Sequence, residues 1–207
     1  IVLDIKASKL KREPNYGLIE QFASECFMPL SYGGGIRTIE QAKRLFSIGV
    51  EKICIQSAAL EKKSFIKELS NKFGSSSIIF SLDLKKNWLG QIKGYSYLSQ
   101  SWLKETWLNV LKSAVNEGAG EIFLNSIDLE GSMTGLNLEV VKKVTSLIDV
   151  PTIFSGGIGS IDHIKKAFSL GANSISAGSF FVFHGPHRAV LITYPNTNDL
   201  ENFKVIL

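Results

Sequence analysis

Glycine and polar residues recur where apolar segments of the chain end. Gly34-Gly35 and Ser57 have counterparts in Gly156-Gly157 and Ser179, at a constant offset of 122 residues. Glycines let a backbone approach a ligand closely, and successive backbone N–H groups beside a hydroxyl can hold the oxygens of an anion. The spacing therefore predicts two phosphate sites, which a substrate with a phosphate at each end would span. For either pair alone, the steric need for glycine in a tight turn is the alternative explanation.

The repeat covers a complete supersecondary unit. Each copy reads as a glycine turn, a helix, an apolar strand and a terminal serine, which is typical of a βαβ unit built twice. Seven apolar segments in the chain are typical of buried parallel strands. The predicted strands are Ile1 to Ile5, Pro29 to Tyr32, Lys52 to Gln56, Ser77 to Asp83, Glu121 to Asn125, Thr152 to Phe154 and Ser174 to Ala177.

Helical patterns alternate with these strands. Thr38 and Ser160 have the residue type and position of helix N-caps, and glycines follow several of the patterns as helix stops. The predicted helices are Leu18 to Cys26, Ile39 to Ile48, Leu60 to Phe73, Lys104 to Glu117, Leu138 to Leu147 and Ile161 to Leu170, and the stops are Gly49, Gly74, Gly118 and Gly171.

Strict alternation with an internal duplication predicts an α/β fold of the (βα)8 TIM barrel type, made of duplicated half-barrels in one domain over 1–207. Such barrels commonly have about 250 residues, and closure needs an eighth strand, so we expect the first βα unit to be absent from this numbering. Residues 85–101 alternate polar and aromatic side chains, which predicts a β-hairpin inserted in a βα loop. The hairpin is either a lid over the catalytic face or a surface decoration.

Composition excludes several classes of partner. The 23 Lys and Arg residues exceed the 19 Asp and Glu residues by four, and they are scattered, which argues against a nucleic-acid groove and is compatible with a phosphorylated substrate. No apolar segment approaches the roughly 20 residues of a membrane span. Cys26 and Cys54 lie in apolar surroundings without CxxC spacing, so we expect both to be small core residues without a disulfide. Free cysteines fit a protein of the reducing cytoplasm.

Five motifs together resemble the cyclase subunit of imidazole glycerol phosphate synthase, and the resemblance extends from Ile1 to about Phe183. The motifs are Tyr-Gly-Gly-Gly-Ile at 32–36, Ser-Leu-Asp at 81–83, Gly-Ala-Gly-Glu-Ile at 118–122, Ser-Ile-Asp-Leu-Glu-Gly at 126–131 and Ser-Gly-Gly-Ile at 155–158. In that family the barrel takes ammonia from a glutaminase subunit. It uses the ammonia to cleave and cyclise a bis-phosphorylated ribonucleotide into imidazole glycerol phosphate and an aminoimidazole carboxamide ribotide. No cofactor is expected.

The resemblance also implies site residues. The family uses two carboxylates for acid–base work, and Asp83 corresponds to the one that ends the fifth strand, while its partner would precede Ile1. An aspartate in this position could instead cap the next loop. The implied phosphate- and substrate-binding residues are Gly35, Gln56, Ser57, Asn125, Gly131, Gly157, Gly178 and Ser179.

Charged residues at the beginnings of strands match the family's ammonia gate. Lys52 and Glu121 begin two predicted strands, and Glu51 corresponds to an acidic residue that faces the glutaminase. Charges that point into the bottom of a barrel are costly unless they are paired. The alternative is a salt-bridge plug that only closes the barrel.

The tail from Phe180 to Ile192 departs from the family pattern, because its Gly185-Pro186 pair breaks a closing helix. It resembles a divergent branch associated with acetamidino groups on surface sugars, in which the barrel and its glutaminase supply ammonia to an amidating enzyme. His184 and His187 are either site residues of that branch or surface residues, and no metal site is expected. A third hypothesis is an ammonia conduit without chemistry of its own. An Asp at the end of the first strand would favour the cyclase, and an apolar residue there would favour the branch or the conduit.

Overall fold

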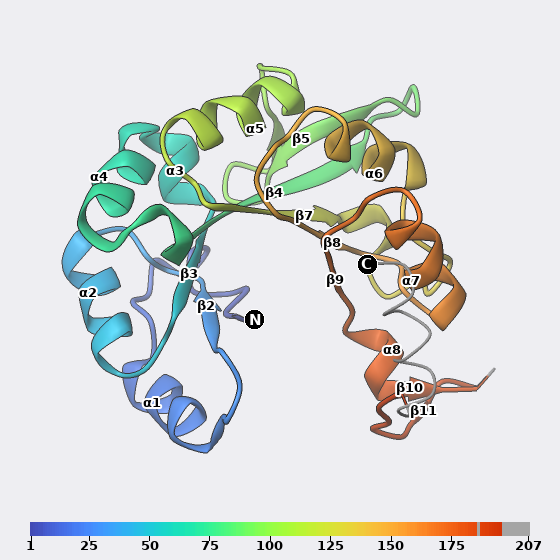
Figure 1. The fold of residues 1–207 in the computed structure, drawn as a ribbon, viewed down its shortest axis with the longest axis horizontal. Helices are drawn as coiled ribbons and strands as arrows, with labels where there is room; N and C mark the ends of the chain where they lie inside the picture. The colour runs from blue at the N-terminus through green and yellow to red at the C-terminus, as the bar shows by residue number, and fades with distance from the viewer. Residues whose placement is uncertain (186, 196–207) are drawn as a thin grey trace. The chain divides into compact units, whose positions relative to one another are not determined.

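The computed structural model describes residues 1–185 and 187–195, and these form two compact units (Figure 1). Unit 1 contains Ile1–Leu82 and Tyr95–Phe123, and unit 2 contains Asp83–Gly94 and the described residues from Leu124 onward. Strands β4 and β7 contribute residues to both units. The predicted helix breaker Pro186 and the end of the predicted domain, 196–207, lie outside the described residues.

Unit 1 alternates strands and helices, as predicted. Its strands β1, β2, β3 and β4 pair in this order, and each pairing is parallel. The α/β class with a parallel sheet is therefore confirmed. The elements up to β7 are β1 (Val2–Leu3), α1 (Tyr16–Glu25), β2 (Ser31–Gly33), α2 (Ile39–Ser47), β3 (Lys52–Ile55), α3 (Ser57–Glu61), α4 (Ser64–Phe73), a 3-10 helix (Ser75–Ser77), β4 (Ile78–Lys86), β5 (Ile92–Ser96), β6 (Ser101–Trp102), α5 (Trp107–Asn116) and β7 (Glu121–Ser126).

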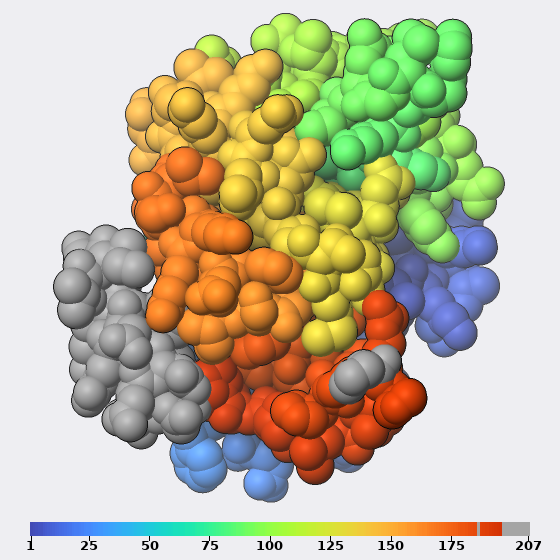
Figure 2. All heavy atoms as spheres, turned by 90° about the vertical axis from the view of Figure 1, so that its right-hand side faces the viewer, coloured from blue at the N-terminus to red at the C-terminus, as the bar shows by residue number. Residues whose placement is uncertain are grey.

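Unit 2 continues the same alternation, and β8 lies between β7 and β9 in the sheet. Its elements after β7 are a 3-10 helix (Ile127–Leu129), α6 (Leu138–Thr145), β8 (Thr152–Ser155), α7 (Ile161–Phe168), β9 (Ser174–Ser176), α8 (Ser179–Val182), β10 (Phe183–His184) and β11 (Ala189–Val190). The last two strands form an antiparallel hairpin. Figure 2 shows a face of unit 2 on which the red segment of α8 to β11 lies directly beside the orange region of α7.

Apolar side chains from strands and helices make a continuous core in unit 1. Ile53, Ile78 and Leu82 on the strands are fully buried, as are Leu45 and Leu69 on the helices. Helix α2 packs on β3 between α1 and α4, as Figure 1 shows. Burial of both sheet faces explains why the predicted strands read as unbroken apolar segments.

The repeat detected in the sequence is also present in the strand register. In the first copy Ser31 is paired with Lys52, and in the second copy Ile153 is paired with Ser174, which is the same pairing shifted by 122 residues. Helix starts follow the same rule, because Thr38 accepts a hydrogen bond from the N–H of Gln41 and Ser160 accepts one from His163. The predicted N-caps are thus confirmed.

One predicted helix is wrong. The segment Leu60 to Phe73 was expected to be continuous, but α3 ends at Glu61 and α4 begins at Ser64, with Lys62 in an extended conformation between them. In a continuous helix Ala59 and Ile66 would share one buried face, and Lys62 or Lys63 would lie between them on that face. A lysine would then be placed in the core. The break instead lets Lys62 pair with Glu68.

The segment after β4 turns back on itself. β5 pairs with β4 on one side and with β6 on the other, and the rings of Tyr95 and Trp102 lie 5.2 Å apart. The Asn87 side chain closes the turn by accepting from the N–H groups of Leu89 and Gln91. Within the described part of the chain, no helix has the length and apolar character needed to cross a membrane.

Candidate functional site

The glycine turn that follows β2 lies under the loop that follows β1. Gly34 and Gly35 both have positive φ angles, of 121° and 72°. A Cβ atom on Gly34 would lie 2.5 Å from the carbonyl oxygen of Asp4, and one on Gly35 would lie 2.5 Å from that of Arg12. Close approach of two backbones therefore requires glycine at both positions.

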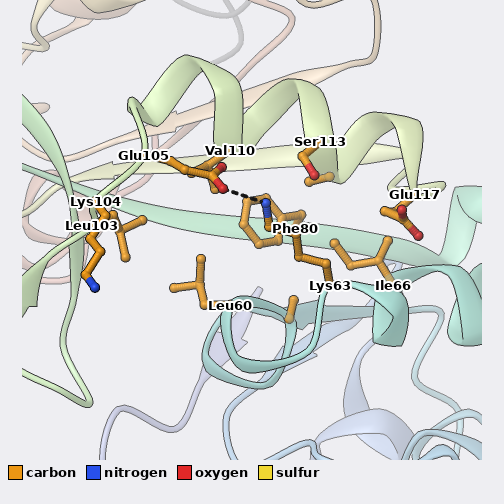
Figure 3. Close-up of a pocket in the computed structure, with 12 residues that line it drawn as sticks. Leu60, Lys63, Ile66, Phe80, Leu103, Lys104, Glu105, Val110, Ser113 and Glu117 are labelled. Carbon is orange, nitrogen blue, oxygen red and sulfur yellow. Dashed lines mark hydrogen bonds and ion pairs between the residues drawn. The ribbon is translucent and has the colours of Figure 1, made fainter.

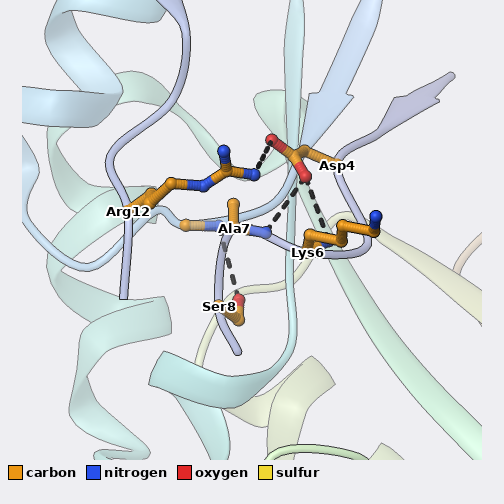
Figure 4. Close-up of polar contacts among 6 residues, drawn as sticks. Asp4, Lys6, Ala7, Ser8 and Arg12 are labelled. Atoms are coloured by element: carbon orange, nitrogen blue, oxygen red, sulfur yellow. Dashed lines mark hydrogen bonds and ion pairs between the residues drawn. The ribbon is translucent and has the colours of Figure 1, made fainter. Parts of the chain in front are cut away.

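Asp4 organises the loop that covers this turn (Figure 4). Its Oδ1 atom accepts hydrogen bonds of 3.0 Å from the N–H groups of Lys6 and Ala7, and its Oδ2 atom lies 4.0 Å from Arg12 Nη2. The carboxylate thus acts locally as a cap for the turn. Gly35 is buried, and its N–H donates to Ser8 Oγ at 3.4 Å.

Gln56 and Ser57 follow β3 directly. Gln56 Nε2 donates to the carbonyl oxygen of Tyr95 at 3.4 Å, and Ser57 is the first residue of α3. Because Gly33 is paired with Cys54, the loops that follow β2 and β3 leave the sheet at the same edge. Unit 1 therefore brings the predicted residues Gly35, Gln56 and Ser57 to one set of strand ends.

Unit 2 contains the second set of predicted binding residues and brings two of them together. A Cβ atom on Gly131 would lie 3.9 Å from Ser179 Oγ, so these two residues are neighbours. Gly157 has a φ of 95°, and its carbonyl oxygen accepts a 2.7 Å hydrogen bond from Gly135 N–H. Gly178 differs, because no atom lies within 4 Å of a Cβ placed on it. Space remains beside Gly178, where a backbone-binding ligand would need it.

Asp83 lies near the end of β4 and is partly buried. Asn125 Nδ2, on β7, donates to Asp83 Oδ1 at 3.4 Å. The Oδ1 atom of Asn125 is buried and has no hydrogen-bond partner within the described residues. These two predicted site residues therefore form a polar pair in unit 2.

The predicted gate residues form an ion pair in unit 1. Lys52 Nζ contacts Glu121 Oε1, and the two side chains are 33% and 18% exposed. Each is the first residue of its strand, β3 or β7. Glu51 precedes them, is exposed, and donates its N–H to the carbonyl oxygen of Leu30. A partly desolvated pair is costly to break, because one charge would be left without its partner.

Tyr32 is a buried polar group that sequence reasoning missed. Its hydroxyl has no hydrogen-bond partner within the described residues. Burial, with a smaller contribution from the charge of Asp4, raises the pKa of Tyr32 to about 12. In the sequence Tyr32 was noted only as the first residue of a glycine motif. No local pattern predicts that the residue is only 3% exposed.

A cavity of about 190 Å³ in unit 1 contains none of the predicted site residues. It lies among α3, α4 and α5, and its lining includes Leu60, Ile66 and Phe80 (Figure 3). Lys63 and Glu105 point toward one another there and form an ion pair of 2.8 Å. The apolar lining is typical of imperfect helix packing rather than of a phosphate site.

The described residues contain no group of three or more His, Cys, Asp or Glu side chains that could hold a metal. His184 on β10 and the following His187 are both exposed. Cys26 and Cys54 are free thiols. Cys54 is buried as expected, but Cys26 is only partly buried, so the expectation that both lie in the core is wrong for Cys26.

Parallel strands that alternate with helices, with glycine turns and polar side chains after the strands, define a protein of the α/β class with a parallel sheet. A family model described as "Histidine biosynthesis protein" matches residues 1–187, and the chain belongs to this family. A provisionally named imidazole glycerol phosphate synthase subunit HisF of Leptospira borgpetersenii is 46% identical over 204 residues, which cover 97% of this chain and 80% of that protein. A provisionally named subunit hisF2 of Pseudomonas aeruginosa is 46% identical over 208 residues, with the same two coverages. The imidazole glycerol phosphate synthase subunit HisF of Thermobifida fusca is 34% identical over 186 residues, which cover 87% of this chain and 73% of that protein.

Proposed function

We propose that this protein is a cyclase-type subunit of imidazole glycerol phosphate synthase. It takes ammonia from a glutaminase and converts a bis-phosphorylated ribonucleotide into imidazole glycerol phosphate and an aminoimidazole carboxamide ribotide, in the cytoplasm. In this proposal the chain is one (βα)8-barrel domain of duplicated half-barrels, with 85–101 as an inserted hairpin. The observation that carries it is the repeat, because two glycine turns in equal register suit a substrate with two phosphates.

Each phosphate has its own set of residues in the proposal. Gly35, Gln56 and Ser57 serve one phosphate in unit 1. Gly131, Gly157, Gly178 and Ser179 serve the other in unit 2. Support comes from the neighbouring positions of Gly131 and Ser179 and from the open space at Gly178. Backbone N–H groups and hydroxyls of this kind bind phosphate oxygens without a metal.

Asp83 supplies the acid–base step, and Asn125 contributes to substrate binding beside it. A carboxylate can accept a proton from a reacting group and return it later in the reaction. The hydrogen bond from Asn125 supports this role, because it holds the carboxylate next to a residue proposed to bind the substrate.

Lys52 and Glu121 control the passage of ammonia, and Glu51 faces the glutaminase. Their ion pair supports the proposal, since pairing offsets the cost of holding two partly buried charges at the beginnings of the strands, where the passage would start. The same edge of unit 1 exposes Phe27 completely, just before β2. An exposed aromatic side chain beside exposed charges suits a protein partner, which here is the glutaminase.

A second candidate is a paralogue that passes ammonia to an enzyme that amidates surface sugars. Two observations favour it. The segment after β9 forms only the four-residue helix α8 before the β10–β11 hairpin. Vibrio vulnificus also has provisionally named hisF2 and hisF3 relatives, at 39% and 43% identity, so such proteins occur in several copies in one organism.

One experiment separates these functions. The full-length protein is assayed with the bis-phosphorylated ribonucleotide, first with ammonium salt and then with glutamine and its glutaminase. Turnover with ammonium salt supports the cyclase. No turnover with either nitrogen source, together with amidation of a sugar acceptor when the amidating enzyme is added, supports the paralogue. Stimulated glutamine hydrolysis with neither product supports a conduit.

A further inference from the structure

The backbone N–H of Gly35 already donates a hydrogen bond within unit 1. Gly35 is buried, and its N–H donates to the hydroxyl oxygen of Ser8. Figure 4 shows Ser8 beside Ala7 in the loop after β1. The Ser8 hydroxyl therefore lies directly beside the glycine turn of the proposed phosphate site. The question is what Ser8 can offer to a ligand.

Several contacts hold Ser8 in place. The Asp4 carboxylate accepts from Ala7 N–H at 3.0 Å, and Arg12 N–H donates to the carbonyl oxygen of Ala7 at 2.9 Å. From the other side, Arg37 Nη2 donates to the carbonyl oxygen of Ser8 at 3.1 Å. The loop is thus fixed on both sides of the serine, so a ligand would not have to order it. Such preorganisation lowers the entropic cost of binding.

The Ser8 hydroxyl keeps a free donor. A hydroxyl has one proton to donate and two lone pairs that accept, and the contact with Gly35 uses only a lone pair. The part of the chain that the structure describes gives this proton no acceptor. Ser8 is only partly buried, so the proton can reach a ligand. A hydrogen bond accepted from Gly35 also strengthens the hydroxyl as a donor.

The surrounding loop is basic. Lys6, Lys9, Lys11 and Arg12 are all exposed within seven residues of chain. Such a cluster raises the local concentration of anions. The sequence did not predict a role for Ser8, because this serine lies 27 residues from the glycine that it contacts.

We propose that Ser8 is a phosphate-binding residue of unit 1, which accepts a hydrogen bond from Gly35 N–H and donates its own proton to a phosphate oxygen. The inference rests on the proposed phosphate site at the end of β2 and adds a residue to it. Through this hydrogen bond Gly35 also positions the Ser8 hydroxyl.

The test uses inorganic phosphate as the probe and the ¹⁵N-labelled full chain. Backbone amide resonances of Gly35 and Ser57 report the unit 1 site during a phosphate titration, and that of Gly157 reports unit 2. Ser8→Ala is expected to weaken phosphate binding at the unit 1 reporters by about tenfold, the scale of a hydrogen bond to a charged group. The affinity seen at Gly157 should not change. Ser8→Thr keeps the hydroxyl and should restore binding to within about twofold.

Ser24→Ala is the matched control, because Ser24 is an exposed serine of unit 1 whose hydroxyl donates to the carbonyl oxygen of Gln21 on α1. It should bind phosphate like the wild type. If Ser8→Ala binds as tightly as the wild type at the unit 1 reporters, the role of Ser8 is overturned while the phosphate site stands. If the wild type shows no phosphate response at Gly35 and Ser57, the proposed phosphate site itself is overturned, and Ser8 with it.

Discussion

Lys52 on β3 and Glu121 on β7 form an ion pair although β4 lies between their strands in the sheet. The two side chains therefore reach past β4 at the end where the strands begin. An interaction across an intervening strand ties three strands together at one edge. It also places opposite charges where the proposed ammonia passage would start.

Lys52→Ala is expected to separate the two nitrogen sources. Turnover with ammonium salt should stay within about twofold of the wild type, while glutamine-dependent turnover falls by about tenfold, because the passage and not the chemistry is changed. Steady-state rates with each nitrogen source check this. Lys63→Ala is the control, since it removes a lysine from another ion pair of unit 1, with Glu105. Equal losses with both nitrogen sources in Lys52→Ala would rule out a gate.

Asp83→Asn is expected to lower the rate of cyclisation by about 100-fold, the scale of a lost general acid or base. The substitution keeps the size of the side chain and removes its ability to take up a proton. Single-turnover rates on the full-length enzyme measure the effect. Asp162→Asn is the control, because it alters an exposed carboxylate in the first turn of α7 and should leave the rate of cyclisation unchanged. Full activity in Asp83→Asn would contradict the assignment.

Tyr32→Phe should stabilise the protein by up to about 1 kcal/mol at neutral pH, because it removes a buried hydroxyl without a partner. The pKa of Tyr32 is about 12 in the folded chain against 10.0 for an ordinary tyrosine. The neutral phenol is thus favoured by folding, and this contribution is complete below pH 10 and lost as the pH rises toward 12. In urea titrations, the free energy of unfolding should therefore fall more steeply between pH 10 and 12 for the wild type than for Tyr32→Phe. Parallel curves would show that Tyr32 titrates normally.

Gly157→Ala is expected to destabilise the protein by about 2 kcal/mol or more, since it combines a positive φ with a clash. Its Cβ would lie 2.2 Å from the carbonyl oxygen of Gly135. Gly178→Ala is the matched control, because its φ is −110° and its Cβ would meet open space, so the free energy of unfolding should change by less than about 0.5 kcal/mol. Denaturant titrations of both variants provide the comparison, and a stable Gly157→Ala would mean that the turn can rearrange.

Local signals in the sequence were sufficient to locate the strands and the starts of α2, α6 and α7. Helices α1 and α5 begin at Tyr16 and Trp107 rather than at the predicted Leu18 and Lys104. Thr38 and Ser160 cap the helices that they were predicted to cap, because an N-cap contact spans only three residues. The break at Lys62 was missed because both halves are strongly helical and only packing shows which face must be apolar. Ser8 and Tyr32 were missed for a similar reason. Their contacts join segments far apart in the chain, and no local pattern records such neighbours.

Equal strand register in the two copies has a consequence for how such a chain can arise. In each copy the paired strands, the helix cap and the glycine turn lie within one short stretch of sequence, so the copy contains everything that sets its own geometry. Duplication of one gene segment would then create a second glycine turn whose geometry is already complete. Later substitutions could adapt each turn to its own end of a ligand, and the geometry of the turn would have to evolve only once.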